Sequence, residues 1–272
     1  MRITKMAQEP IEQFPYLTAG AGDKGVIQSW LPIYLGEMAE MPDWCDAVIV
    51  TSDLQGVTES DEHEQVLLGE VLPAFVSLLL QVEKPSVRPE RTLVLLCGDL
   101  YADPLKRGSS GDPLSVWTAF RQEFGHVVGV AGNHDLFEAD SIGKLRNMER
   151  VTLISEPEIV LANQLRIAGL GGIIGLSDKA NRRDLPSFLQ SLAALLRKEP
   201  DVLLLHQGPD EPALGLPGVA EIRTKLQQHA PTLVCCGHVH WAEHLVEWTQ
   251  GTQVLNADGK LFVFTRANEK SD

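Results

Sequence analysis

The chain has 272 residues, of which 44% are apolar and 22% charged, a composition typical of a globular enzyme. A chain of this length can bury a large core as one domain or at most two. Its net charge of −14 opposes long-range attraction to nucleic acid or to an anionic membrane, but it does not exclude a small phosphate substrate. The sequence has no apolar run near the ~20 residues that span a bilayer, and its N-terminus lacks the apolar core of a secretory signal. We therefore expect a cytoplasmic protein.

The first 45 residues precede the first strand that carries a ligand motif. We expect them to form an N-terminal extension that packs on a core of residues 46–272, in a single domain overall. A glycine-rich break at residues 19–25 is followed by apolar residues at roughly helical spacing. This spacing predicts a helix over residues 26–38.

Several apolar segments that indicate buried strands end in residues that commonly bind metals. The segment and the residues that follow it are 47–51 with Asp53 and Gln55, 93–97 with Asp99, 127–131 with Asn133, His134 and Asp135, 202–205 with His206, and 233–236 with His238 and His240. Open α/β sheets place their ligand sites at the carboxyl ends of strands. The sequence therefore predicts that these side chains meet at one edge of a sheet.

Amphipathic spacing predicts helices between these strands, at residues 61–84, 113–124, 183–198 and 219–229. Ser60 is the expected N-cap of the first helix, and Pro85 and Pro231 are expected to end the first and the last. Further strands are expected at residues 151–154, 158–161, 165–170, 245–248, 253–256 and 261–265. Asp258-Gly259 predicts a hairpin between the last two. Early strand–helix alternation with a late antiparallel tail predicts an α/β protein with mixed sheets flanked by helices.

Asp, Asn and His at neighbouring strand ends suit a pair of divalent transition metals. One carboxylate must bridge two such ions, and Asp99 is the natural bridge because its motif lies between the others in the chain. Such ions clamp a phosphate and lower the pKa of a bridging water, which gives a nucleophile near neutral pH. In the motif of residues 132–135, we expect Asn133 to ligate, His134 to protonate the leaving oxygen, and Asp135 to orient His134 and raise its basicity.

Taken in order, these motifs resemble those of the calcineurin-like metallophosphoesterase superfamily over roughly residues 47–240. They are Asp53-x-Gln55, Gly98-Asp99, Gly132-Asn133-His134-Asp135, His206 and Gly237-His238-Val239-His240. The resemblance implies a four-layer α/β/β/α sandwich of two mixed β-sheets flanked by helices, with a dimetal site at the carboxyl ends of strands. It implies one metal held by Asp53, Gln55, Asp99 and His240, and a second held by Asp99, Asn133, His206 and His238. His134 would lie beside the scissile phosphate.

The sequence departs from this family pattern at two places. Gln55 stands where the family usually has His, and an amide oxygen is a weaker donor to a transition metal than imidazole. We therefore expect the metal at that position to bind more weakly or to be a harder ion, with Mn2+ first and Mg2+, Fe or Zn as alternatives. Many members also continue Gly-Asp-x-x-Asp-Arg, whereas Asp103 is displaced by one position here and no Arg follows it. The missing Arg disfavours a protein Ser/Thr phosphatase.

Several residues outside the motifs have more than one interpretation. The cysteines, Cys45, Cys97, Cys235 and Cys236, lack a CxxC spacing and are expected to be buried free thiols. The glycine-rich residues 169–175 do not fit a dinucleotide-binding fingerprint and favour a close packing turn. His63 could compensate for Gln55, or it could be a surface residue. Trp117, Trp241 and Trp248 could be core residues or pocket walls, and Trp241 could line the substrate cleft because it follows the last motif.

The function that we expect is hydrolysis of a small-molecule phosphate mono- or diester. The resemblance implies attack of a metal-bridging hydroxide, with His134 as acid to the leaving group. An alternative, motivated by Gln55, is a degenerate metal-binding scaffold or regulatory phosphate-binding module with little hydrolysis. We expect specificity to come from loops 56–60, 103–113 and 208–218 and from the N-terminal 45 residues. We expect no membrane partner and no nucleic acid partner, and the sequence gives no indication of an oligomeric state.

Overall fold

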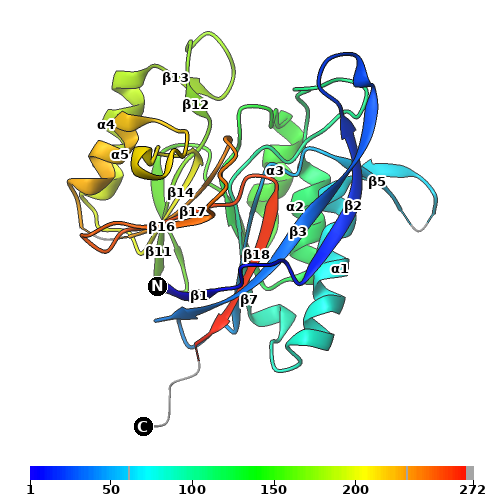
Figure 1. Cartoon of the computed structure of the whole chain (residues 1–272), viewed down its shortest axis with the longest axis horizontal. Coiled ribbons are helices and arrows are strands. Elements are labelled where there is room, and N and C mark those ends of the chain that lie inside the picture. The colour runs from blue at the N-terminus through cyan, green and yellow to red at the C-terminus, as the bar shows by residue number, and fades with distance from the viewer. Residues whose placement is uncertain (61, 231, 268–272) are drawn as a thin grey trace.

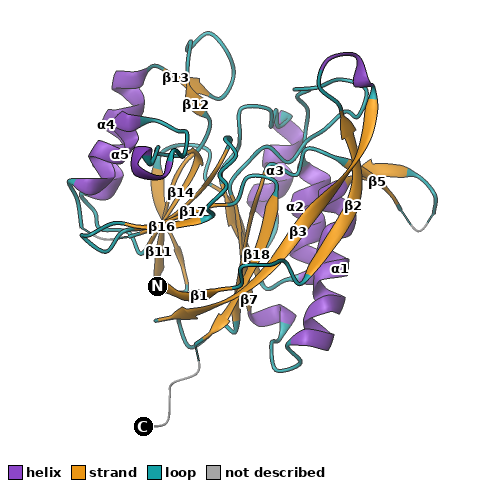
Figure 2. Cartoon of the chain, viewed as in Figure 1, coloured by secondary structure: helices purple, strands orange, loops and turns teal. Residues whose placement is uncertain are grey.

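Over residues 1–60, 62–230 and 232–267, which the computed structural model describes, the chain forms two large β-sheets packed face to face (Figure 1). Helices cover the outer face of each sheet, so that strands occupy the middle and helices the two sides (Figure 2). The four-layer α/β/β/α sandwich expected from the resemblance is therefore confirmed. No helix in this part of the chain is long and apolar enough to cross a membrane.

The first sheet contains the N-terminal strands and the first three strands that carry ligand motifs. In spatial order its strands are β6 (Gln65–Leu67), β5 (Val57–Glu59), β2 (Glu12–Ala19), β3 (Val26–Ala39), β18 (Lys260–Arg266), β4 (Ala47–Ser52), β7 (Thr92–Leu96), β8 (His126–Gly129) and β9 (Val151–Leu153), and β1 (Arg2–Met6) pairs with β3. Strands β4, β7, β8 and β9 are parallel, so their carboxyl ends meet at one edge.

The second sheet carries the remaining motif strands. Its order is β10 (Glu158–Ala162), β11 (Leu165–Leu170), β14 (Val202–Gln207), β15 (Leu233–Gly237), β17 (Gln253–Asn256) and β16 (Leu245–Glu247). Strands β11, β14, β15 and β17 run parallel. A short separate ladder joins β12 (Ile173–Ile174) to β13 (Arg182–Arg183).

Hydrophobic clusters fill the space between the layers. One cluster lies between the sheets, where Val50 and Leu95 of the first sheet and Leu204 and Cys235 of the second are fully buried. A second lies under α1 (Leu68–Glu83), α2 (Leu114–Glu123) and α3 (Ala139–Asn147), and a third under α4 (Leu185–Leu196) and α5 (Ala220–Gln227). Short 3-10 helices occur at Gly22–Lys24, Pro89–Arg91 and Pro212–Leu214.

The strands that carry the motifs lie where the sequence predicts them, to within a few residues. The predicted helices at residues 113–124, 183–198 and 219–229 correspond to α2, α4 and α5. The cysteines are buried and free, as expected. The glycine-rich turn is a close packing turn, because a Cβ on Gly171 would lie 2.8 Å from the Ala131 carbonyl oxygen.

The helix predicted over residues 26–38 is wrong, because this segment is the long strand β3. Leu31 and Ile33 face the helices, whereas Tyr34 and Met38 face the second sheet. A strand buried on both faces has apolar residues at many spacings, including the helical one. Pro32 is the contrary signal, since a proline inside a helix costs about 3 kcal/mol.

Other local predictions are also corrected. The helix predicted from residue 61 begins at Leu68, because the chain first forms the β5–β6 hairpin. The Ser60 hydroxyl accepts a hydrogen bond from Glu64 N (3.2 Å) in the turn of this hairpin, so it does not cap the helix. Strands β17 and β18 belong to different sheets, so Asp258-Gly259 does not close a hairpin between them. Helix α3 was not predicted. Asp61 and Pro231 lie outside the described residues.

The N-terminal strand β3 tests how far the first residues belong to the core. We expect Ile33→Ala to lower the free energy of unfolding by about 2–5 kcal/mol, because the side chain is fully buried against the helices. Val26→Ala, at a position of the same strand that is 41% exposed, is the matched control and should change little. Urea unfolding followed by circular dichroism measures both. An unfolding free energy unchanged in Ile33→Ala would show that β3 is dispensable to the core.

Candidate active site

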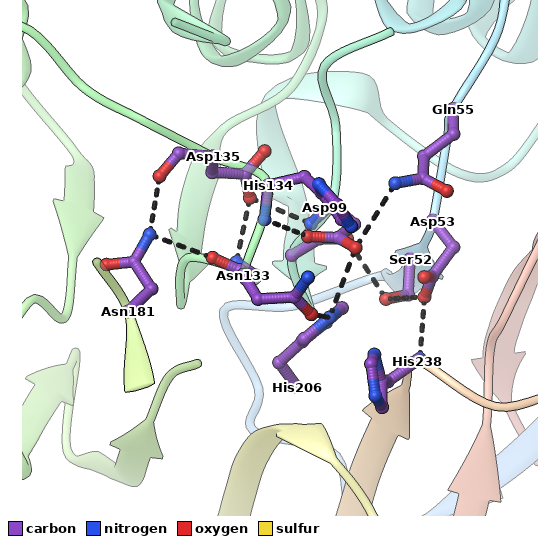
Figure 3. A network of polar contacts seen from close by, with 12 residues as sticks. Ser52, Asp53, Gln55, Asp99, Asn133, His134, Asp135, Asn181, His206 and His238 are labelled. Atoms are coloured by element: carbon purple, nitrogen blue, oxygen red, sulfur yellow. Dashed lines mark hydrogen bonds and ion pairs between the residues drawn. The ribbon is translucent and has the colours of Figure 1, made fainter. Parts of the chain in front are cut away.

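The motif residues meet where the carboxyl ends of β4, β7 and β8 in the first sheet approach those of β14 and β15 in the second (Figure 3). Hydrogen bonds join these strand ends directly. Asp53 N donates to Gly98 O (2.9 Å) within the first sheet. His238 N donates to Asp53 Oδ2 (2.9 Å) and so connects the two sheets. The site is therefore built into the junction of the sheets.

Three of the expected ligand residues have a left-handed backbone. The φ angles are 55° at Asp53, 55° at Asp99 and 71° at His238. Residues other than glycine rarely adopt this conformation, which costs on the order of 1–3 kcal/mol and clusters at functional sites. The sharp turn lets each strand end bring its side chain to the centre, and the surrounding hydrogen bonds hold it there.

The glycines that begin the last motifs are required by close approach to carboxylates. A Cβ on Gly132 would lie 2.0 Å from Asp99 Oδ1, and a Cβ on Gly237 would lie 2.2 Å from Asp53 Oδ2. Neither position can hold a side chain without moving a carboxylate. The Gly-Asn-His-Asp and Gly-His-x-His motifs thus have a steric reason for their first residue.

The residues expected to hold the second metal are together. Asp99, His206 and His238 each offer a ligand atom, and these atoms all lie within 4.8 Å of one another. Asn133 Oδ1 lies 3.2 Å from His206 Nε2. The other nitrogen of His206, Nδ1, donates to the Cys97 carbonyl oxygen (2.8 Å), which fixes the ring and turns Nε2 toward the cluster. Mixed oxygen and nitrogen donors of this kind fit a divalent transition metal.

The electrostatics of the cluster also fit a bound cation. Burial raises the pKa of Asp53 to about 7, with the charges of Asp258 and Asp99 adding to the shift. Burial by itself would lower the pKa of His206, but the Asp99 carboxylate outweighs it and the pKa is raised to about 10. Burial and the His206 charge lower the pKa of His238 to about 4. Protonated His206 therefore supplies positive charge among these carboxylates, and a divalent cation would supply more.

The residues expected to hold the first metal are less completely assembled. Gln55 points toward Asp99, and its Nε2 donates to Asp99 Oδ2 (3.2 Å) (Figure 3). Asp53 Oδ2 accepts from Ser52 Oγ (2.6 Å) as well as from His238 N. The His240 side chain is 73% exposed and its Nδ1 lies 3.3 Å from Asp258 Oδ2. Within the described residues, His240 belongs to no cluster of metal-binding side chains.

His134 lies beside the cluster, but Asp135 does not orient its ring. His134 N donates to Asp99 Oδ1 (2.8 Å), and the ring Nδ1 lies 3.1 Å from Ser110 Oγ. The Asp135 carboxylate instead accepts hydrogen bonds of 2.8 Å each from the backbone N–H groups of Asp99, Leu100 and Gly132. The expected contact between Asp135 and the imidazole is wrong, because these backbone groups occupy both carboxylate oxygens.

Some residues of the site carry no motif signal in the sequence. Asn181 reaches in from beyond the second sheet, and its Nδ2 donates to Gly132 O (3.0 Å) and Asp135 O (2.6 Å), which clamps the turn of His134. Ser110 and Asp258 hold the rings of His134 and His240. Lys260, which is 3% exposed, lies close enough to Asp258 and Asp53 to be influenced by their charges. Only the three-dimensional fold brings these positions together.

The other candidates lie away from the centre. Trp241 does not line a cleft, because it is fully buried in the core under α4 and α5 and donates from Nε1 to Pro217 O (2.7 Å). Trp117 and Trp248 are also core residues. The His63 ring is exposed in the β5–β6 turn, with Nδ1 3.4 Å from Glu59 Oε1.

Residues 47–242 match the family described as calcineurin-like phosphoesterase, so the chain belongs to this family. The chain is thus a metallophosphoesterase by family, and it contains a possible site for divalent metal. A comparison with curated proteins finds no match.

Several solved structures are similar at low sequence identity. One is a hypothetical protein from Thermus thermophilus, with 16% identity and a TM-score of 0.45 over 79% of this chain and 76% of that one. Phosphopantetheinyl hydrolase from Mycobacterium tuberculosis has 12% identity and a TM-score of 0.43 over 77% of this chain and 88% of that one. A novel archaeal phosphodiesterase has 15% identity and a TM-score of 0.35 over 78% of this chain and 83% of that one.

Loss of His206 should remove metal from the cluster. We expect His206→Ala to bind divalent metal at least about tenfold more weakly, because it removes a buried nitrogen donor that the fold already orients. Metal content per chain after purification without chelator, followed by calorimetric titration, measures the effect. His229→Ala is the matched control, since that ring contacts only the Lys225 carbonyl on α5. Equal metal content in the two variants would contradict the assignment.

Proposed function

We propose that the protein is a metal-dependent phosphoesterase that hydrolyses a small-molecule phosphate mono- or diester with two divalent ions, Mn2+ first among them. The observation that carries this proposal is the approach of Asp99, His206 and His238 to within 4.8 Å, next to the His134 turn. The ligand residues are Asp53, Gln55, Asp99 and His240 for one ion, and Asp99, Asn133, His206 and His238 for the other. Bound ions would neutralise the phosphate and acidify a water molecule.

The chain's own residues orient the centre. Asp99 lies between the two ligand sets, and it is held by His134 N on one oxygen and by the Gln55 amide on the other. Because Ser110 occupies Nδ1 of His134, Nε2 is the nitrogen that can give a proton to the leaving oxygen. Asp135 contributes by holding the backbone of both turns, so its role is positioning.

A second candidate function is a metal-binding scaffold with little hydrolysis. The exposed His240 ring and the amide of Gln55, which donates a hydrogen bond to Asp99, favour it, since both belong to the less assembled ligand set. Metal content per chain and Mn2+ titration of bis-p-nitrophenyl phosphate hydrolysis distinguish the two functions. Two metals with turnover support the esterase. One metal with no turnover on added Mn2+, against this ester or a phosphopeptide, supports the scaffold.

Replacement of His134 tests the acid role. We expect His134→Ala to retain metal and to lose about 10²–10⁴-fold in turnover, the range of general acid catalysis. Ser110→Ala should lose less, because it frees the ring without removing it. Both are measured as kcat at matched metal loading, with an ester of a poor leaving group. Wild-type turnover in His134→Ala would rule out the acid role.

Replacement of Gln55 tests the first ligand set. We expect Gln55→His to tighten the weaker metal, because imidazole is a better donor than an amide oxygen. Gln55→Ala should weaken it. Competition titration with a fluorescent chelator gives the two affinities and the stoichiometry. If neither variant changed the stoichiometry or the affinities, Gln55 would not be a ligand.

A further inference from the structure

A cavity of about 640 Å3 adjoins the candidate metal centre on the side of Asp53 and Gln55. One wall is the β2–β3 hairpin, the opposite wall is the loop of residues 101–109, and residues 258–260 close one end. Ligand pockets of about 300–1,000 Å3 hold molecules much larger than a phosphate group. The cavity therefore has room for most of a substrate whose phosphate lies at the centre.

The hairpin wall exists because β3 is longer than its neighbour. Strand β18 begins at Lys260 and pairs with β3 only from Ile33 onward. Residues 26–32 of β3 pair with β2 alone, so this part of the hairpin rises past the sheet (blue in Figure 1). Trp30 lies on this stretch, lines the cavity and is 52% exposed. Exposed indole next to a polar site offers a stacking surface for a flat aromatic group.

The opposite wall carries positive charge. Lys106 and Arg107 line the cavity, and neither side chain has an ion pair or hydrogen bond with the described residues. Arg88 and Arg91, by contrast, both pair with Asp46. In a chain with a net charge of −14, two cations without partners beside a phosphate site favour a second anionic group. The same loop continues to Ser110, which contacts the catalytic candidate His134.

We propose that the substrate is a nucleotide phosphodiester that carries a second phosphate. Its base stacks on Trp30, its second phosphate binds Lys106 and Arg107, and its scissile diester lies at the metal centre. This inference rests on the proposed function and assigns the substrate class of the same site. A purely apolar substituent would leave Lys106 and Arg107 without an anion, and a simple monoester would leave most of the cavity filled with water.

The test compares esters that differ by one group at a time. The dinucleotide pApA has two bases and a terminal phosphate, ApA lacks the terminal phosphate, and methyl p-nitrophenyl phosphate is too small to fill the cavity. Base stacking contributes enough that Trp30→Ala should lower kcat/KM for both dinucleotides roughly tenfold. The small ester should change less than about twofold. Trp30→Phe should restore most of the loss, because phenyl also stacks.

The cationic wall has its own matched comparison. Arg107→Gln should lower kcat/KM roughly tenfold for pApA and much less for ApA, because only pApA carries the terminal phosphate. Arg197→Gln and Leu161→Ala are the controls, since both positions are exposed and neither lines the cavity. Circular dichroism and thermal unfolding confirm that each variant is folded.

A binding measurement separates this inference from the proposed function. Titration of pApA into the protein in EDTA, without turnover, should quench tryptophan fluorescence in the wild type and not in Trp30→Ala. Turnover of the small ester with no dependence of either dinucleotide on Trp30 or Arg107 would overturn the inference and leave the phosphoesterase standing. A preference for glycerophosphodiesters over ApA and pApA would also overturn it. Trp30-dependent binding with no turnover of any ester would overturn the proposed function, and with it the assignment of pApA as a substrate.

Discussion

The structure depends on placing three carboxylates, Asp53, Asp99 and Asp135, where two sheets meet and little water reaches. Burial raises the pKa of Asp53 and Asp135, to about 7 and about 6, because charged groups lose solvation there. Backbone N–H groups and the buried His206 ring offset that cost. The pKa of Asp99 is the one that falls: burial alone would raise it, but the His206 charge outweighs that effect. The centre is held together as an arrangement of charges, and bound cations complete it.

This arrangement also explains how the fold holds its strained turns. Asp135 accepts hydrogen bonds from the turn after β7 and from the turn after β8, so one buried carboxylate sets the spacing of two strand ends. Asp53 performs the corresponding task between the sheets through His238 N. The left-handed conformations at Asp53, Asp99 and His238 persist because side chains and backbone on neighbouring strands over-determine them. Ligand position and strand register are therefore one problem with one solution.

The sequence predicts the sandwich and the ligand cluster because both depend on short local patterns. Each motif follows directly on an apolar strand, and parallel strands bring their carboxyl ends together whatever the rest of the chain does. Strand β3 was not predictable from apolar spacing, since its two faces are buried by different layers. The contacts of Asp135, Ser110 and Asn181 depend on how loops far apart in the chain approach one another, which no local spacing encodes. Gln55 was visible as a departure, but its contact with Asp99 was not.

The two halves of the centre differ in what surrounds them. Asn133, His206 and His238 lie deep between the strand ends, and none of them lines the cavity. Asp53, Gln55 and His240 do line it, and this is the half in which the chain departs from the family pattern and in which His240 is mostly exposed. The cavity wall on this side comes from the β2–β3 hairpin, which lies outside the part of the chain that matches the family. The buried half thus supplies the chemistry common to the family, whereas the open half joins the weaker ligands to the surface that selects the substrate. A ligand that fills the cavity would also exclude water from Gln55 and His240, so substrate binding and occupancy of the first metal site are expected to be coupled.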